Sequence, residues 1–138
     1  MVEKFGGITY LVLFIIHFAA YAIYAFRCVF GTKAFVNQYD MGDGAAIMTK
    51  FFGSIFIGSV LMALYIMLVR PAGLEGTWAF FNLVFLQNLF AFLISLISHR
   101  KGQLGVNEKT SVEGNIAPGI LTLLSGLLCY GLADKIYY

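Results

Sequence analysis

Four long stretches of this 138-residue chain contain no Asp, Glu, Lys or Arg. They are Phe5–Phe26, Phe51–Val69, Gly76–His99 and Gly114–Ala133, with lengths of 22, 19, 24 and 20 residues. A helix needs roughly 20 mostly apolar residues to cross the hydrocarbon core of a bilayer. Because lipid offers the backbone no hydrogen bonds, each stretch is expected to be helical. The pattern therefore predicts four transmembrane helices.

The composition supports the same reading. Hydrophobic residues make up 60% of the chain and charged residues 12%, whereas a typical soluble domain has about 25% charged residues. A soluble domain of this length would have too few polar residues to cover four apolar helices. The net charge of +2 also argues against a nucleic-acid-binding protein. We predict one integral membrane domain over residues 1–138, with membrane lipids around it.

The expected fold class is all-α, an antiparallel four-helix bundle. We expect helices over about residues 7–30, 44–69, 77–99 and 115–133. The short link after Arg70–Pro71 makes the second and third helices a hairpin. The segment that carries Phe35, Val36 and Tyr39, after the first helix, fits either a short interfacial helix or an ordinary loop.

The basic residues predict an orientation in the membrane. One side of the expected bundle holds three of them: Lys4, Arg70 and Lys135. The other side holds six, which are Arg27, Lys33, Lys50, Arg100, Lys101 and Lys109. Since basic residues are enriched in cytoplasmic loops, both termini are expected on the non-cytoplasmic side of a plasma, inner or organellar membrane.

Polar residues within the spans are the candidate functional residues. His17 and Gln87 each lie ten residues into a helix that starts on the same side, so both are expected about 15 Å deep. The predicted layer near the membrane midplane is His17, Tyr21, Gln87, Asn88 and Ser125. Polar groups at this depth either bind a ligand or hold helices together through hydrogen bonds, and the sequence leaves both readings open.

Small residues at helical spacing predict close helix packing. They are Ser54 and Gly58 in the second helix, and Gly119 and Gly126 in the fourth. Such residues let the backbones of membrane helices approach each other.

The sequence predicts no catalytic residue, no metal site and no cofactor. The alternatives are a quinone or another apolar ligand at the polar layer, and a lipid head group at His99–Lys101, a basic cluster that also fits a membrane anchor. No charged residue lies inside a span, which argues against proton-coupled transport. His17 and His99 lie about 18 Å apart in depth, too far for one bis-His haem. Two isolated His residues do not make a zinc site.

The start of the second helix resembles a known family. Lys50–Gly58 reads KFFGSIFIG; it follows Phe35…Tyr39 and a glycine break, and Arg70–Pro71 comes after it. This layout resembles small four-helix membrane proteins of the DoxX-like family. The resemblance implies a four-helix bundle. Some members of that family are membrane subunits of quinone-linked sulfur oxidoreductases, but the likeness gives no site residue to carry over.

Three functions follow as hypotheses. The first is a non-catalytic accessory or structural subunit that associates with other integral membrane subunits or with itself. The second is a DoxX-like, quinone-linked redox subunit that binds its ligand near His17, Tyr21 and Gln87. The third is a small-molecule channel or facilitator.

Overall fold

The computed structural model describes every residue from Met1 to Tyr138, and its regular secondary structure is all helical, without strands. Four helices are long: α1, α3, α4 and α5. The elements are η1 (Glu3–Phe5), α1 (Ile8–Val29), α2 (Thr32–Gln38), η2 (Asp43–Ala45), α3 (Ala46–Leu64), η3 (Tyr65–Val69), α4 (Trp78–Lys101), α5 (Glu113–Gly131) and α6 (Ala133–Ile136).

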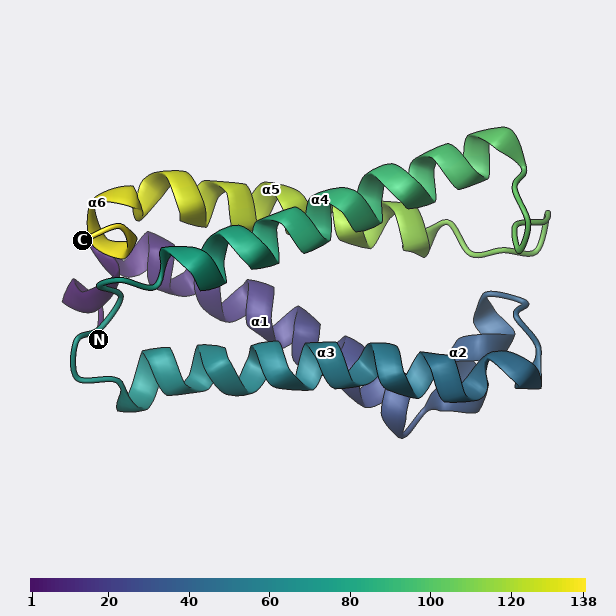
Figure 1. Ribbon diagram of the computed structural model, residues 1–138, viewed down its shortest axis with the longest axis horizontal. Coiled ribbons are helices and arrows are strands. Elements are labelled where there is room, and N and C mark those ends of the chain that lie inside the picture. The colour runs from purple at the N-terminus through teal and green to yellow at the C-terminus, as the bar shows by residue number, and fades with distance from the viewer.

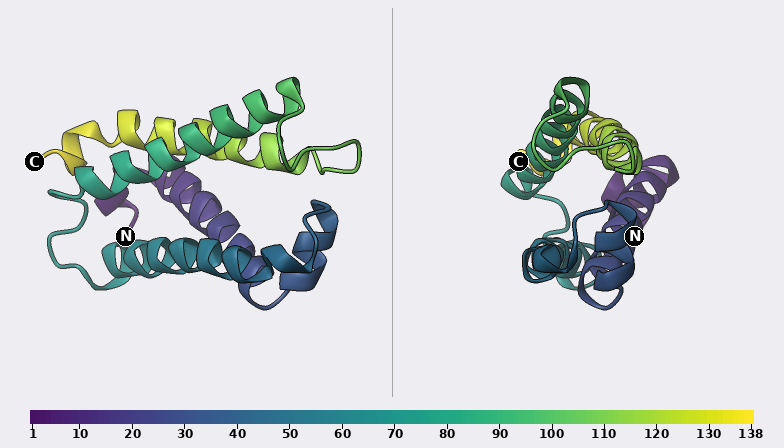
Figure 2. Two further views of the ribbon diagram at one scale, coloured as in Figure 1. Left: turned by 45° about the vertical axis from the view of Figure 1, so that its right-hand side comes forward. Right: turned by 90° about the vertical axis from the view of Figure 1, so that its right-hand side faces the viewer.

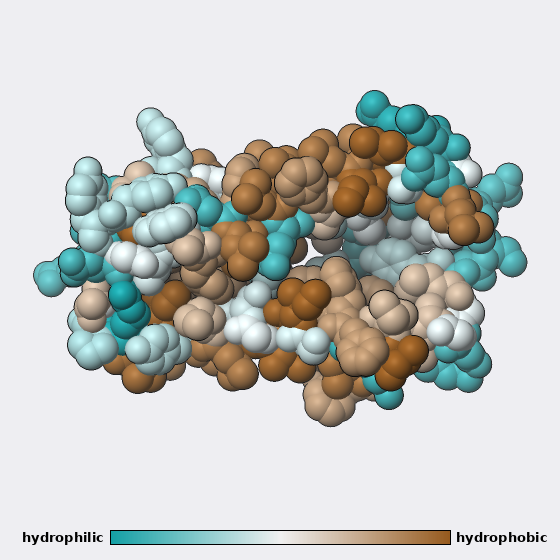
Figure 3. All heavy atoms as spheres, viewed as in Figure 1, coloured by the Kyte–Doolittle hydropathy of each residue, from teal (hydrophilic) through white to brown (hydrophobic).

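Four helical segments are long and apolar enough to cross a membrane, as an integral membrane protein requires. They are Ile8–Val29, Asp43–Val69, Trp78–Lys101 and Glu113–Gly131, and their ends lie within two residues of the predicted ones. Only 25 of the 138 residues are buried, and many large apolar side chains are exposed along the middle of the bundle, between more hydrophilic ends (Figure 3). In water such a surface would be strongly unfavourable, whereas lipid solvates it.

The four long helices form an antiparallel bundle of two pairs. α1 packs along α3, α4 packs along α5, and α1 crosses the bundle to reach α5 (Figures 1 and 2). α3 and α4 are joined by the short link but make little direct contact, and they diverge away from it. Both termini lie at the end with this link, which we call the terminal half; the end with α2 and the 102–112 loop is the distal half.

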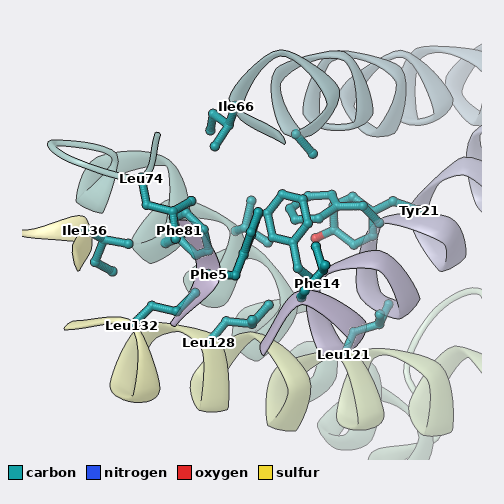
Figure 4. Close-up of a cluster of buried hydrophobic side chains, with 14 residues drawn as sticks. Phe5, Phe14, Tyr21, Ile66, Leu74, Phe81, Leu121, Leu128, Leu132 and Ile136 are labelled. Carbon is teal, nitrogen blue, oxygen red and sulfur yellow. The ribbon is translucent and has the colours of Figure 1, made fainter. Parts of the chain in front are cut away.

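The terminal half is closed by a core of apolar side chains from the four long helices, the link between α3 and α4, and the segments next to both termini. Phe5 and Phe14 are almost completely buried, with ring centroids 4.8 Å apart, and Phe81 lies 5.9 Å from Phe14. Leu132 and Ile136 close the core from the C-terminal side (Figure 4). The residues adjoining the termini thus take part in the core, which holds both ends of the chain in place.

The small residues divide into two groups. Gly119 and Gly126 face α4, where an added Cβ would meet the rings of Phe92 and Phe85 at 3.1 and 3.3 Å. Ser54 and Gly58, by contrast, are exposed, and a Cβ at Gly58 would have no neighbour within 4 Å.

The predicted packing residues of the second helix, Ser54 and Gly58, therefore make no close helix contact within this chain. Gly53 is the buried glycine, and an added Cβ there would lie 2.8 Å from the side chains of Cys28 and Val29 on α1. One residue turns a helix by about 100°, so neighbouring positions face different partners.

The segment after α1 is a short helix, α2, of seven residues. The hydroxyl of Thr32 donates to the carbonyl oxygens of Cys28 and Val29, at 2.7 and 3.0 Å, where the chain turns. Val36 is buried, whereas Lys33 and Asn37 are exposed. α2 packs on both α1 and α3 and covers this pair at the distal end.

Candidate functional site

Four of the five predicted midplane residues form one buried hydrogen-bonded cluster. Asn88 of α4 is its centre: its Oδ1 accepts a bond of 2.7 Å from the hydroxyl of Tyr21, and its Nδ2 donates to Ser125 Oγ at 3.2 Å. The same Nδ2 lies 2.9 Å from Nε2 of His17. The cluster joins α1, α4 and α5 at one level, and we call it the polar layer.

The hydrogen bonds define the roles of the groups in the polar layer. Ser125 donates its own hydroxyl proton to the carbonyl oxygen of Leu121 at 2.6 Å, so its oxygen is free to accept from Asn88. An amide nitrogen can only donate, so Nε2 of His17 accepts and the imidazole proton is on Nδ1. That Nδ1 is buried and has no hydrogen-bond partner.

Gln87 does not join the polar layer. Its side chain is exposed on the outer face of α4 and makes no hydrogen bond within the chain, while Asn88 points inward. Adjacent residues on a helix are rotated by about 100°, so Gln87 and Asn88 cannot both face the bundle interior. The prediction includes both residues in the layer because adjacent residues lie at nearly the same depth.

Beside the polar layer, the distal half contains an open cleft of about 430 Å³. It lies between the α1–α3 pair and the α4–α5 pair, where the surface is hollowed (Figure 3). The cleft is lined by Tyr24, Phe35, Tyr39, Met41, Ala45, Met48, Thr49, Phe52, Phe56, Asn88, Ala91, Glu113, Gly114, Ala117, Pro118 and Leu121. Asn88 thus connects the cleft to the polar layer.

A charged network closes the distal end of the cleft. Glu113 at the start of α5 accepts bonds from Arg27 Nη1 at 2.7 Å and from the Tyr24 hydroxyl at 2.6 Å. Gln38 bridges the two charged side chains, since it accepts from Arg27 and donates to Glu113. The Arg27 guanidinium also lies over the rings of Tyr24 and Phe35, at 5.2 and 5.3 Å from their centroids.

The hydroxyl of Tyr39, a residue of the cleft lining, has no hydrogen-bond partner in the protein. Its ring packs on Phe35, with centroids 4.9 Å apart, and none of the hydrogen bonds of the structure involves its hydroxyl. Burial and, after it, the nearby carboxylate of Glu113 together raise the pKa of Tyr39 to about 12, against the opposing effect of the Arg27 charge. The hydroxyl therefore keeps its proton at neutral pH and can donate it.

This charged network is not among the features predicted from the sequence. Arg27 and Glu113 are 86 positions apart, and each stands at the end of an apolar stretch, where a charge is ordinarily explained as a membrane anchor. The available signal was that both lie on the same predicted side of the membrane and at helix ends that face each other in an antiparallel bundle.

The remaining titratable side chains do not gather into a metal-binding group: no three of the His, Cys, Asp and Glu residues lie close enough to hold an ion. His99 lies near the C-terminal end of α4, where its Nδ1 is 3.1 Å from the carbonyl oxygen of Ser95.

No protein-family model, no curated protein and no solved structure matches this chain. The resemblance to the DoxX-like family therefore stays a hypothesis.

Proposed function

We propose that this membrane protein is an accessory subunit, without catalytic activity of its own, of a larger assembly of integral membrane proteins. The observation that carries the proposal is the exposed, unpaired amide of Gln87. Gln87 lies nine residues after Trp78, the first residue of α4, and fourteen before Lys101, the last, or about 14 and 21 Å from the two ends. Its short side chain reaches neither membrane surface.

An amide that faces hydrocarbon without a partner is unfavourable. Glutamine side chains in membrane helices commonly bond to a neighbouring helix, and no helix of this chain supplies such a bond. The surrounding surface is apolar: Leu83, Leu86, Phe90 and Ile94 are all exposed. A single polar group within an apolar helix face is the pattern expected where another membrane helix, from a different subunit or from a second copy, packs against α4.

We place both termini on the non-cytoplasmic side. The termini share one end of the bundle (Figure 1). The helix ends and loops that form the other end contain six basic residues: Arg27, Lys33, Lys50, Arg100, Lys101 and Lys109. The excess of positive charge at the distal end supports a cytoplasmic location for it.

The other two hypotheses have less support. A quinone held between His17, Tyr21 and Gln87 would need three side chains that face one space, and Gln87 points away from the other two. A channel would need a continuous polar path, but apolar side chains fill the terminal half.

The proposal is tested by the size of the assembly in native membranes. Tagged chain is extracted in lipid nanodiscs without detergent, and its mass is measured by mass photometry. We expect the wild-type chain in particles that contain more protein than one 15.3-kDa copy, and Gln87→Leu in much smaller ones. Ile94→Leu, on the same exposed face, is the matched control and should leave the mass unchanged. A lone wild-type monomer, or no difference between Gln87→Leu and wild type, would contradict the accessory role.

A further inference from the structure

The cleft in the distal half has the size and lining of a binding site for a lipid-soluble molecule. Its volume of about 430 Å³ falls within the range of roughly 300 to 1,000 Å³ that small-molecule sites occupy. Of its 16 lining residues, 11 are hydrophobic, and they surround the space from five helices. Most of a ligand in this cleft would therefore be apolar.

The polar groups of the lining are concentrated at the distal end. Glu113 presents a carboxylate, which accepts hydrogen bonds, and Tyr39 presents a hydroxyl with no partner in the protein. Gly114, beside Glu113, has no side chain, and an added Cβ there would lie 3.2 Å from the Tyr39 ring. The missing side chain lets the Tyr39 ring lie against the backbone of α5 at the residue next to Glu113.

The charges at the distal end of the cleft favour a ligand whose polar group, its head, is neutral. Arg27 neutralises Glu113 at 2.7 Å but is not itself part of the lining. An anionic head would meet the carboxylate without reaching the guanidinium. A cationic head would place a second positive charge beside the Arg27–Glu113 pair, whose two charges already cancel.

The hydrogen-bonding groups also distinguish between neutral heads. A hydroxyl group can donate to Glu113 and accept from Tyr39 at the same time, whereas a carbonyl oxygen only accepts and would be repelled by the carboxylate. We propose that the cleft binds a neutral lipid with a free hydroxyl head, which lies between Tyr39 and Glu113 while its apolar body lies along Phe52 and Phe56. Asn88, whose amide is engaged in the polar layer, forms the inner wall.

The test uses three photoreactive probes that share one 16-carbon, diazirine-bearing chain and differ in the head. The first is a primary alcohol, the second its methyl ether, and the third the carboxylic acid. Full-length protein in lipid nanodiscs is labelled with each, and the labelled residues are located by mass spectrometry. We expect the alcohol to label cleft residues at least five-fold more than either analogue. Equal cleft labelling by the alcohol and the ether, or labelling confined to lipid-facing residues outside the cleft, would overturn the proposal.

Two variants separate the apolar part of the site from its polar part. Ala91→Leu fills the cleft and should abolish alcohol labelling there, whereas Ala79→Leu, on the exposed start of the same helix, should not reduce it. Tyr39→Phe keeps the ring contacts and should weaken alcohol binding about 2- to 12-fold, the effect of one hydrogen bond. If Tyr39→Phe bound the alcohol as tightly as wild type, the proposal that the hydroxyl head of the ligand lies against Tyr39 would be wrong.

This inference is independent of the accessory role. Gln87 lies on the outer face of α4 and does not line the cleft, so Gln87→Leu should leave alcohol labelling unchanged even if it disrupts the assembly.

Discussion

The two halves of the bundle are built from the same helices but packed differently. In the terminal half, Phe5, Phe14 and Phe81 meet in one closed core. In the distal half, α4 and α5 are separated from α3 by the cleft, and the Arg27–Glu113 pair connects α1 to α5. The closed core and the open cleft thus lie at different ends of one small protein.

Close backbone approach explains part of this difference. At the terminal end Gly131 lies against Tyr10, and an added Cβ would be 2.1 Å from the ring, so α5 and α1 meet there without a gap. At the distal end the backbone of α2 packs on α1 and α3, and α2 reaches α5 through side chains, such as Gln38, which donates to Glu113. The bundle is consequently narrow where the termini meet and open at the other end.

The largest expected difference between the halves is in the cost of removing a phenylalanine ring. Phe14 is 1% exposed in the core, whereas Phe52 is 49% exposed at the cleft. Phe14→Ala should lower the free energy of unfolding by about 3 kcal/mol through the loss of packing, and Phe52→Ala by less than about 1 kcal/mol. Equilibrium unfolding in mixed micelles with increasing SDS measures both. Equal losses would show that the two halves are equally closed.

The polar layer lies at the boundary between the halves. Asn88→Leu removes the shared partner of His17, Tyr21 and Ser125 and should cost about 1 to 3 kcal/mol in the same assay. Asn82→Leu, which loses only an exposed bond to Tyr137, is the control and should cost less than about 1 kcal/mol. A neutral Asn88→Leu would mean that the layer contributes nothing to stability.

Substitutions at two glycines test which face of α3 packs against a neighbouring helix. Gly53→Ala would place a Cβ 2.8 Å from Cys28 and Val29, and overpacking of this kind should cost about 1 to 2 kcal/mol. Gly58→Ala meets nothing within 4 Å and should be neutral or stabilising by up to about 1 kcal/mol, because alanine favours the helix. The opposite ranking would place the contact of α3 on the Ser54–Gly58 face.

The smallest expected effect concerns the ion pair at the distal end. The side chains of Arg27 and Glu113 are 28% and 35% exposed, so Glu113→Gln should cost about 1 kcal/mol or less. The free energy of unfolding of the Glu113→Gln variant should also depend less on salt than that of the wild type, since salt screening weakens only the charged pair. Glu108→Gln, in the exposed loop, serves as the control. A salt dependence equal to that of wild type would indicate that the pair is not formed in the membrane.

The sequence was sufficient to predict features that depend on one helix at a time. The charge-free stretches predicted the four long helices, because the length and polarity of a span follow directly from membrane thickness. Matching depth along two helices predicts His17 and Gln87 at one level, with Asn88 in the same layer, and it is Asn88 that the structure places 2.9 Å from His17.

Features that depend on the rotation and crossing of helices were not predicted. Gln87 and Ser54 were assigned to inward faces, yet each is exposed beside an inward-facing neighbour, Asn88 and Gly53. Helical periodicity gives a face only to within about one residue when nearly every position is apolar. The cleft was not foreseen either, since it arises from the divergence of α3 and α4, which no local pattern encodes.

The divergence of α3 and α4 is tested most directly by two distances between spin labels in lipid nanodiscs, with Cys28 and Cys129 replaced by alanine. One label pair is at Leu64 and Leu83 in the terminal half, and the other is at Ile47 and Ile97 in the distal half; all four positions are exposed. Double electron–electron resonance should give a longer distance for the Ile47–Ile97 pair than for the Leu64–Leu83 pair. Equal distances, or a shorter distal one, would contradict a bundle that is closed at its termini and open at its other end.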